Sequence, residues 1–250
     1  MQPPAYVELF HLLFLRQFHT QIDPKLYAIK GGCNLRFFFE SIRYSEDLDI
    51  DIQTIQKSTL QQKVQKILTS PGLLKTLQAY GITQIESSAP KQTETTQRWK
   101  IKLHTQSISL PLSTKIEFSR RQESFNASLA SVPMSLAQAY HLPPTRLSHY
   151  EAQEALNQKV KALAYRALTQ ARDVFDIYHL LHKVVPTPQI YPSAEITAAQ
   201  MALTSLRYQD YQSQVVSFLP LEEQLHFDDL NYWNSMTNAV LAYLQTSSAS

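Results

Sequence analysis

The sequence is poor in cysteine and glycine and has no long hydrophobic run. A single cysteine, Cys33, among 250 residues excludes an intramolecular disulfide framework and a cysteine-based zinc site, and it is consistent with a reducing compartment. No stretch approaches the ~20 apolar residues that a transmembrane helix needs. The apolar residues 7–15 have neither a basic segment before them nor a small-residue cleavage site after them. We therefore expect a cytoplasmic protein without a membrane partner.

An excess of charge of one sign is also missing. The chain contains 23 Lys and Arg and 21 Asp and Glu, which gives a net charge of +2. Bulk charge therefore does not predict nucleic-acid binding, and any such site must be a local patch. With 44% apolar and 18% charged residues, the composition excludes disordered and collagen-like chains. The length fits one globular domain of good size or two small domains packed together.

Hydrophobic periodicity predicts two regions of different structure. A first helix opened by Pro3 and Pro4 precedes alternating strands and helices, and the chain from about residue 146 is mostly helical. We expect an α+β fold in which residues 1–130 form one domain and residues 131–250 a mainly helical second domain, because prolines cluster in 122–146. The expected strands are 26–30, 48–54, 82–87, 98–105 and 113–120, with a loop at 90–97, and the later helices are 34–40, 58–80, 151–168, 172–183, 193–208, 210–218 and 228–245.

Two of the four glycines are adjacent, and they lie between an expected strand and an expected helix. Against an average glycine content of ~7%, the pair Gly31 and Gly32 is conspicuous. Glycine lets the backbone approach a phosphate closely, and the amides at a helix N-terminus point toward it. Taken alone, a Gly-Gly pair is most often a simple turn.

The strand expected at 48–54 carries acidic residues on one face. The apolar residues 48, 50 and 52 alternate with Asp47, Asp49 and Asp51, which is the pattern of a half-buried strand. Side chains at i and i+2 lie about 6 to 7 Å apart on a strand, so Asp47 and Asp49 could share divalent metal ions, whereas Asp51 lies one pleat farther out. Such alternation by itself usually marks a solvated sheet face. Together with the glycine pair it suits phosphoryl transfer.

Three separated motifs resemble one enzyme family. The segment 28–52, AIKGGCNLRFFFESIRYSEDLDIDI, resembles the first motif of the AbiEii/AbiGii-type nucleotidyltransferases, toxins of the DNA polymerase β nucleotidyltransferase superfamily, whose members read Lys-Gly-Gly-Thr-Ala-Leu-Arg and then Arg-x-Ser-x-Asp-x-Asp. STKIEFSR (113–120) resembles the strand with the third carboxylate, and NQKVKALAYRALTQARDVFDIYHL (157–180) resembles the helical motifs. The residues on these patterns are Lys30, Gly31, Gly32, Leu35, Arg36, Arg43, Ser45, Asp47, Asp49, Glu117, Lys159, Ala162, Leu163, Arg166, Arg172, Asp173 and Asp176.

The resemblance implies a polymerase-β-like core, followed by a helical bundle that completes the active site. It implies transfer of a nucleotide from an NTP with Mg²⁺ and release of pyrophosphate. Asp47, Asp49 and Glu117 would hold the metal and act in catalysis, with Glu117 orienting the attacking hydroxyl or accepting its proton, and Lys159 would compensate the charge of the leaving pyrophosphate. The residues that it places at the nucleotide are Lys30, Gly31, Gly32, Arg43, Ser45, Arg166, Asp173 and Asp176.

The resemblance also implies a biological role. The chain would be the toxin of a toxin–antitoxin or abortive-infection system, with a cognate antitoxin as partner and tRNA 3′ ends as acceptor. Two alternatives stay open, namely transfer onto a protein hydroxyl and a catalytically inactive module that binds a nucleotide or an antitoxin. By position alone, the charged residues of 159–176 fit a network on a solvated helix face, which is worth only a few tenths of a kcal/mol per pair.

The first motif departs from the family pattern at two positions. Cys33 stands where the family has Thr or Ser, and Asn34 stands where it has Ala. Because a thiol is a weaker donor than a hydroxyl, only the backbone amides at Cys33 are expected to meet a phosphate. A nucleophilic role for Cys33 is disfavoured because no histidine is near it in the sequence.

Two further groups of residues are weaker candidates. His179 and His182 lack a third ligand at zinc spacing. Several cations could bind an RNA backbone, although an exposed sheet face explains them equally well. These cations are Arg98, Lys100 and Lys102, which share one strand face, together with Arg120 and Arg121.

Overall fold

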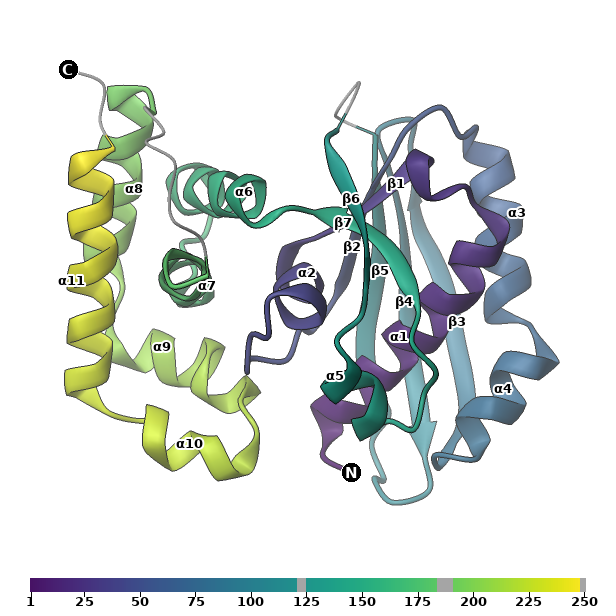
Figure 1. The fold of residues 1–250 in the computed structure, drawn as a ribbon. Coiled ribbons are helices and arrows are strands. Elements are labelled where there is room, and N and C mark those ends of the chain that lie inside the picture. Colours follow the sequence, from purple (N-terminus) through teal and green to yellow (C-terminus); the bar gives the residue numbers. More distant parts are fainter. Residues whose placement is uncertain (121–124, 184–190, 248–250) are drawn as a thin grey trace. The chain divides into compact units, whose positions relative to one another are not determined.

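The computed structural model describes residues 1–120, 125–183 and 191–247, and the chain divides into two compact units (Figure 1). The first unit is Met1–Phe38 with Tyr44–Tyr150, and the second is Phe39–Arg43 with Glu151–Ser250. In the described part of the chain, no helix is both long and apolar enough to cross a bilayer.

A seven-stranded mixed sheet forms the framework of the first unit (Figure 1). The central strands β2 and β5 pair in parallel, as do β1 and β7, whereas the other neighbours are antiparallel. In spatial order the strands are β3 (Ile82–Gln92), β4 (Thr96–Thr105), β5 (Leu112–Ser119), β2 (Leu48–Ile52), β1 (Tyr27–Lys30), β7 (Arg146–Tyr150) and β6 (Ala127–Ser131).

One face of this sheet carries the hydrophobic core. The helices α1 (Pro3–Gln21), α3 (Lys57–Leu68) and α4 (Pro71–Gln78) contribute to it (Figure 1). α1 buries Phe10, Phe14 and Phe18 completely, and the ring of Phe18 lies 5.3 Å from that of Phe118 in β5. Full burial of such a side chain contributes about 1.5 to 3 kcal/mol. Since alternate residues of a strand point to opposite faces, the apolar packing on one face leaves the other face of β2, β4 and β5 to charged side chains.

The described residues of the first unit also form three short helices. η1 (Pro24–Leu26) precedes β1, α2 (Gly31–Phe38) follows it directly, and α5 (Met134–Ala139) lies between β6 and β7 in the chain. α2 packs against β1 and β2.

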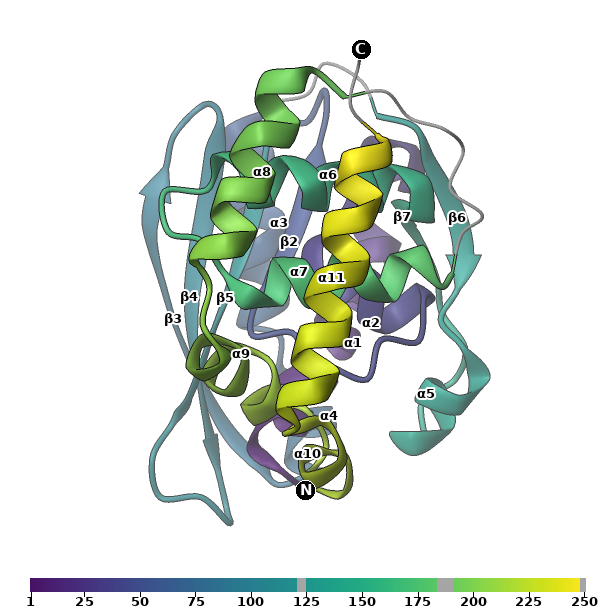
Figure 2. The same cartoon turned by 90° about the vertical axis from the view of Figure 1, so that its left-hand side faces the viewer.

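The second unit consists of helices in two layers (Figure 2). α6 (Ala152–Tyr165) and α7 (Ala171–Leu181) cross the layer formed by α8 (Ser193–Ser205) and α11 (Leu230–Thr246). α9 (Tyr208–Gln214), η2 (Val216–Phe218) and α10 (Leu221–Phe227) lie between α8 and α11 in the chain. Val160, Ile177 and Trp233 are among the side chains buried in this core.

The expected α+β class and the C-terminal helical region are confirmed. The helix expected over 58–80 is instead two helices, α3 and α4. Ser70 caps α4 by accepting a hydrogen bond from Leu73 N, and Pro71 occupies the first turn, where its missing N–H costs nothing.

The expectation that the chain is helical from residue 146 is wrong at its start. Arg146–Tyr150 forms β7, which pairs with β1 and β6, and the elements β6, α5 and α10 were not expected. The loop expected at 90–97 is shorter, because β3 extends to Gln92 and β4 begins at Thr96. Residues 146–150 thus join the sheet by hydrogen bonding although the sequence groups them with the helical part. The division of the chain at residues 130 and 131 itself stays a proposal.

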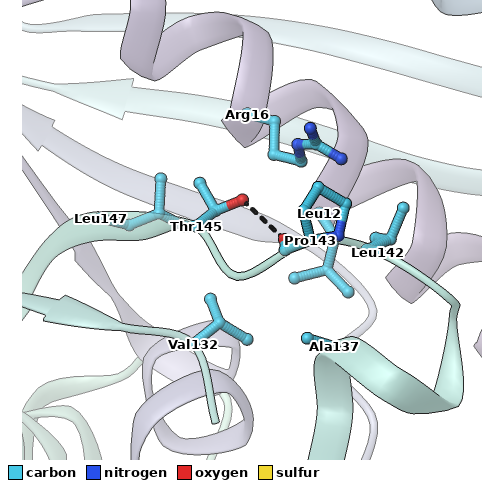
Figure 3. A pocket seen from close by; sticks show the side chains of 8 residues that line it. All are labelled: Leu12, Arg16, Val132, Ala137, Leu142, Pro143, Thr145 and Leu147. Carbon is cyan, nitrogen blue, oxygen red and sulfur yellow. Dashed lines mark hydrogen bonds between the residues drawn. The ribbon is translucent and has the colours of Figure 1, made fainter. Parts of the chain in front are cut away.

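An apolar pocket of the first unit lies among α1, α5 and β7 (Figure 3). Its one charged lining residue is Arg16, and none of the candidate site residues contributes to it. Within it, the hydroxyl of Thr145 donates to the backbone O of Pro143 at 3.3 Å. The pocket therefore offers no group for phosphoryl chemistry. Its lining residues are Leu12, Arg16, Val132, Ala137, Leu142, Pro143, Thr145 and Leu147.

Candidate active site

Three carboxylates lie on the face of the sheet opposite the core. Asp47 immediately precedes β2 and Asp49 is its second residue. The parallel pairing of β2 with β5 makes Glu117 the direct partner of Asp49, and directly paired residues share a face. Leu48 and Ile50 are fully buried on the other face. The sheet thus brings together the three carboxylates that the sequence proposed from two separate segments.

Two of these carboxylates are ion-paired with cations of the same sheet. Lys115 Nζ lies 2.6 Å from Asp47 Oδ2, and the backbone N–H of Lys115 donates to Asp47 Oδ1 at 3.2 Å. Arg98, the cross-strand partner of Glu117 on β4, places Nη2 2.6 Å from Glu117 Oε2. All four side chains are partly exposed, between 21% and 34%, so water screens these attractions.

Asp49 lies among these charges. Burial raises the pKa of its carboxyl above the ordinary value. Lys115 and Lys30 lower that pKa, whereas the negative charges of Asp47 and Glu117 raise it. A carboxylate in such surroundings is stabilised by any further positive charge that reaches it.

The donor set fits a hard divalent cation by chemistry. Carboxylate oxygens are the protein ligands that Mg²⁺ uses, and the mutual repulsion of Asp47, Asp49 and Glu117 favours such an ion. Among the described residues, however, no three His, Cys, Asp or Glu side chains are already arranged around one point. Lys115 and Arg98 hold two of the carboxylates instead. A metal at this face would therefore compete with these two cations.

The turn between β1 and α2 brings the backbone against Asp49. Gly31 has a φ of +68°, which L side chains rarely adopt, and a Cβ on it would lie 3.1 Å from Asp49 Oδ2. Lys30, the residue before it, pairs with Asp51, which also accepts a hydrogen bond from the hydroxyl of Tyr150 at 2.8 Å. Asp51 is 2% exposed, so it is a buried partner of Lys30 and no part of a solvated face.

Two other residues proposed at the nucleotide lie near the same turn or strand. Gly32 is the second residue of α2. The hydroxyl of Ser45 donates to the backbone O of Asp47 at 2.8 Å. Ser45 thus contacts the segment that presents the first carboxylate.

The five remaining candidate residues form a network in the second unit. Lys159 Nζ lies 3.1 Å from Asp173 Oδ1 and 2.6 Å from Asp176 Oδ2. Arg43 donates to both carboxylate oxygens of Asp176, and Arg166 Nε lies 2.9 Å from Asp173 Oδ2. Both aspartates are completely buried. Burial alone would raise the pKa of Asp176, but Arg43 and Lys159 lower it to about 2. The network is therefore interior, in contrast to a solvated helix face.

The weaker candidates have ordinary partners. His179 Nε2 and His182 Nδ1 each bind a backbone carbonyl oxygen at 2.8 Å. Arg120 is turned inward, onto Gln97 and the backbone O of Ile55, and Arg121 lies outside the described residues. Three cations of β4 do share one face, where Lys100 and Lys102 are exposed and Arg98 is half-buried.

The structure adds residues that sequence reasoning missed. Cys33 is completely buried, and its Sγ lies 3.6 Å from Nδ1 of His11, which is also buried. The partner of His11 on its other side is Thr114, 103 residues away in the sequence, a separation that leaves no local signal. The second departure from the pattern, Asn34, donates to the backbone O of Tyr150 at 2.9 Å, so it ties α2 to β7.

Comparison with known proteins identifies relatives along nearly the whole chain. Residues 13–242 match a protein family described as "Nucleotidyl transferase AbiEii toxin, Type IV TA system". No curated protein matches the chain. The solved structure of JHP933 from Helicobacter pylori is similar with a TM-score of 0.54 at 17% identity, covering 98% of this chain and 94% of that one.

A second solved structure is more similar in shape. MenT4, the nucleotidyltransferase toxin Rv2826c from Mycobacterium tuberculosis H37Rv, has a TM-score of 0.62 at 15% identity, covering 97% of this chain and 84% of that one. At these identities the two structures show a shared fold.

Proposed function

Because the chain belongs to the AbiEii nucleotidyltransferase toxin family of type IV toxin–antitoxin systems, we propose that it transfers a nucleotide from an NTP, with Mg²⁺, to the 3′ end of a tRNA. The observation that carries the proposal is the meeting of Asp47, Asp49 and Glu117 on one face of β2 and β5. These three residues would hold the metal. A divalent cation there supplies electrostatic stabilisation of the triphosphate and of the leaving pyrophosphate.

Glu117 is the proposed base. The acceptor hydroxyl oxygen bonds to the α-phosphorus, the bond from that phosphorus to the bridging oxygen of the β-phosphate breaks, and pyrophosphate leaves. The proton of the hydroxyl goes to the Glu117 carboxylate. Glu117 is 21% exposed at its side chain, so its carboxylate is accessible to an incoming acceptor.

The phosphates would lie against the turn between β1 and α2. A glycine at residue 31 lets the chain pass within contact distance of the Asp49 carboxylate, and the first amides of α2 follow immediately. Gly32, Lys30 and Ser45 belong to the same proposed surface.

The second unit contains the other residues that the sequence predicts at the nucleotide. Of the three cations in its network, Arg166 is the most exposed, at 36% of its side chain, whereas Lys159 is at 10% and Arg43 at 3%. Arg166 and Lys159 share Asp173 as a partner. We therefore propose Arg166 as the group that meets an anion directly, with Arg43, Lys159, Asp173 and Asp176 holding it in place. The sequence suggests that Lys159 contacts a phosphate directly. Such a contact would require the Lys159 amine to break its ion pairs with the buried carboxylates of Asp173 and Asp176.

The face around the carboxylates favours an RNA acceptor over a protein hydroxyl. Arg98 adjoins Glu117, and the exposed Lys100 and Lys102 continue the same face along β4. Rows of cations bind nucleic-acid backbones through phosphate contacts and release of counterions. A cognate antitoxin follows from the type of system named by the family.

Labelled nucleotides test the proposal. The protein is incubated with each α-labelled NTP, Mg²⁺ and either total tRNA or cell lysate, with Asp49→Asn as the inactive control. Label in the RNA fraction supports the proposal, label in protein supports transfer onto a protein hydroxyl, and no label supports a binding module without activity.

A matched pair of variants tests the acceptor surface. Lys100→Gln with Lys102→Gln removes two charges from the face that carries the carboxylates, and Lys66→Gln with Lys75→Gln removes two exposed charges from α3 and α4. Only the first pair should weaken RNA labelling and reduce its salt dependence. Equal effects of the two pairs would point to bulk charge alone.

A further inference from the structure

A chain of buried hydrogen bonds lies beneath the first carboxylate. His11 Nε2 is 2.8 Å from Thr114 Oγ1, and Thr114 Oγ1 donates to the backbone O of Glu46 at 2.7 Å. His11 Nδ1 is 3.6 Å from Cys33 Sγ, and Cys33 Sγ donates to the backbone O of Asp47 at 3.2 Å. His11, Cys33 and Thr114 are buried, and they come from α1, α2 and β5. Three separate elements thus converge on two successive peptide groups.

The directions of these hydrogen bonds follow from chemistry. A carbonyl oxygen only accepts, so the hydroxyl of Thr114 gives its hydrogen to Glu46 O. The oxygen of Thr114 must then accept from His11 Nε2–H. Burial lowers the pKa of His11 to about 4, so the imidazole is neutral near pH 7 and its Nδ1 is an acceptor. The thiol of Cys33 gives its one hydrogen to the backbone O of Asp47, and its sulfur contacts Nδ1 of His11 at 3.6 Å.

Every group of this chain acts on the segment that presents Asp47. The carbonyl of Asp47 accepts from both Cys33 and Ser45, and the carbonyl before it accepts from Thr114. The side chain of Asp47 is held as well, because the backbone N–H of Lys115 donates to Asp47 Oδ1. Two consecutive peptide planes are fixed, so the direction of the bond from Cα to Cβ of Asp47 is fixed as well.

We infer that His11, Cys33 and Thr114 are positioning residues, which form a relay that aims the Asp47 carboxylate at the metal. The inference rests on the proposed role of Asp47 as a metal ligand. It also explains the role of Cys33. The Cys33 thiol is buried and donates to the backbone of Asp47, so it is not available to a phosphate bound at the amides of α2. Groups that orient a ligand in this way commonly change metal affinity or activity by about 10- to 100-fold when they are removed.

The test compares metal affinity with stability. Thr114→Val keeps the shape of the side chain but removes its hydroxyl, and Thr114→Ser restores the hydroxyl. Binding of Mn²⁺ to the full chain is measured by calorimetry, melting temperature by differential scanning fluorimetry, and kcat and KM for the NTP by labelling. We expect Thr114→Val to weaken Mn²⁺ binding about 10-fold or more and to lower kcat more than it changes KM, and Thr114→Ser to return Mn²⁺ binding to within about twofold of the wild type.

A stability control separates positioning from packing. Tyr140→Phe removes another buried hydrogen bond of the same unit, from Tyr140 to Glu8 at 2.7 Å. It should lower the melting temperature without changing Mn²⁺ binding. Wild-type affinity in Thr114→Val, with a melting temperature lowered as in Tyr140→Phe, would overturn the inference. If Thr114→Val does not fold, Cys33→Ala against Cys33→Ser gives the same comparison.

The variant Asp47→Asn distinguishes the inference from the function on which it rests. Weak Mn²⁺ binding in both Asp47→Asn and Thr114→Val supports the relay. Weak binding in Asp47→Asn alone overturns the relay and leaves the metal role of Asp47 intact. Unchanged binding in Asp47→Asn overturns both.

Discussion

His11 should make the first unit less stable in mild acid. Its ring is completely buried, with one nitrogen on Thr114 and the other facing Cys33. Burial lowers its pKa from 6.5 to about 4, and the charge of Asp47 only partly opposes this effect. As pH falls below 6.5, the unfolded chain takes up a proton at His11 that the folded chain does not bind until about pH 4.

The sign and size of the effect follow from proton linkage. Stability falls where the unfolded state binds more protons, so the penalty is nearly absent at pH 7 and grows as pH falls toward 4. One pKa unit corresponds to about 1.4 kcal/mol, so a fall from 6.5 to about 4 has a ceiling of about 3 kcal/mol. Between pH 7 and pH 5, the loss should be about 2 kcal/mol.

Urea unfolding of matched variants measures this loss. The two tryptophans, Trp99 and Trp233, lie one in each unit, so fluorescence in a Trp233→Phe background reports the first unit. His11→Gln keeps an amide donor for Thr114 and does not titrate. We expect the free energy of unfolding to drop by about 2 kcal/mol more in the parent than in His11→Gln between pH 7 and pH 5. Equal drops in the two proteins would refute the buried, neutral histidine.

Three other changes have expected outcomes. Gly31→Ala places a Cβ 3.1 Å from Asp49 Oδ2 at a φ of +68°, so labelling should fall at least about 10-fold for a stability loss of only about 1 to 2 kcal/mol; normal labelling would contradict the proposed turn. Lys115→Met removes the competitor for Asp47, and calorimetry should show Mn²⁺ binding about two- to fivefold tighter, since a partly exposed pair is worth up to about 1 kcal/mol. Lys159→Met leaves two buried aspartates undercompensated and should destabilise the second unit by about 3 to 5 kcal/mol, followed by Trp233 fluorescence; a small loss would mean that the network is not buried.

Local sequence patterns predicted the two strands that carry the candidate carboxylates. The alternation around Asp49 predicted β2, and its apolar residues are buried as that pattern requires. The glycine pair predicted the end of β1, but the helix expected over 34–40 begins earlier, because α2 starts at Gly31. The break at Ser70 and Pro71 was not predicted, although both are standard helix-start residues.

The elements that the sequence did not predict depend on partners far along the chain. β7 is only five residues long and is held between β1 and β6, and β6, ASLAS, contains no β-branched or aromatic residue. β7 depends on hydrogen bonds from β1, more than one hundred residues earlier in the case of Ile29 and His149, and β6 pairs in turn with β7. Neither segment therefore predicts a strand by itself. Family resemblance is confirmed across residues 13–242, whereas the roles of single residues stay predictions.

The near-balance of positive and negative charges in the sequence is also found within the candidate site, where carboxylates and cations form ion pairs. Asp47 pairs with Lys115 and Glu117 with Arg98, so cations that a count of charges treats as available are already bound to carboxylates. A divalent cation that took over Asp47 and Glu117 would free both side chains beside the two exposed lysines of β4. The face would then become more basic as metal binds, and a polyanionic acceptor would bind it more strongly. Metal and RNA binding should therefore favour each other by the same factor, since coupling between two ligands is reciprocal.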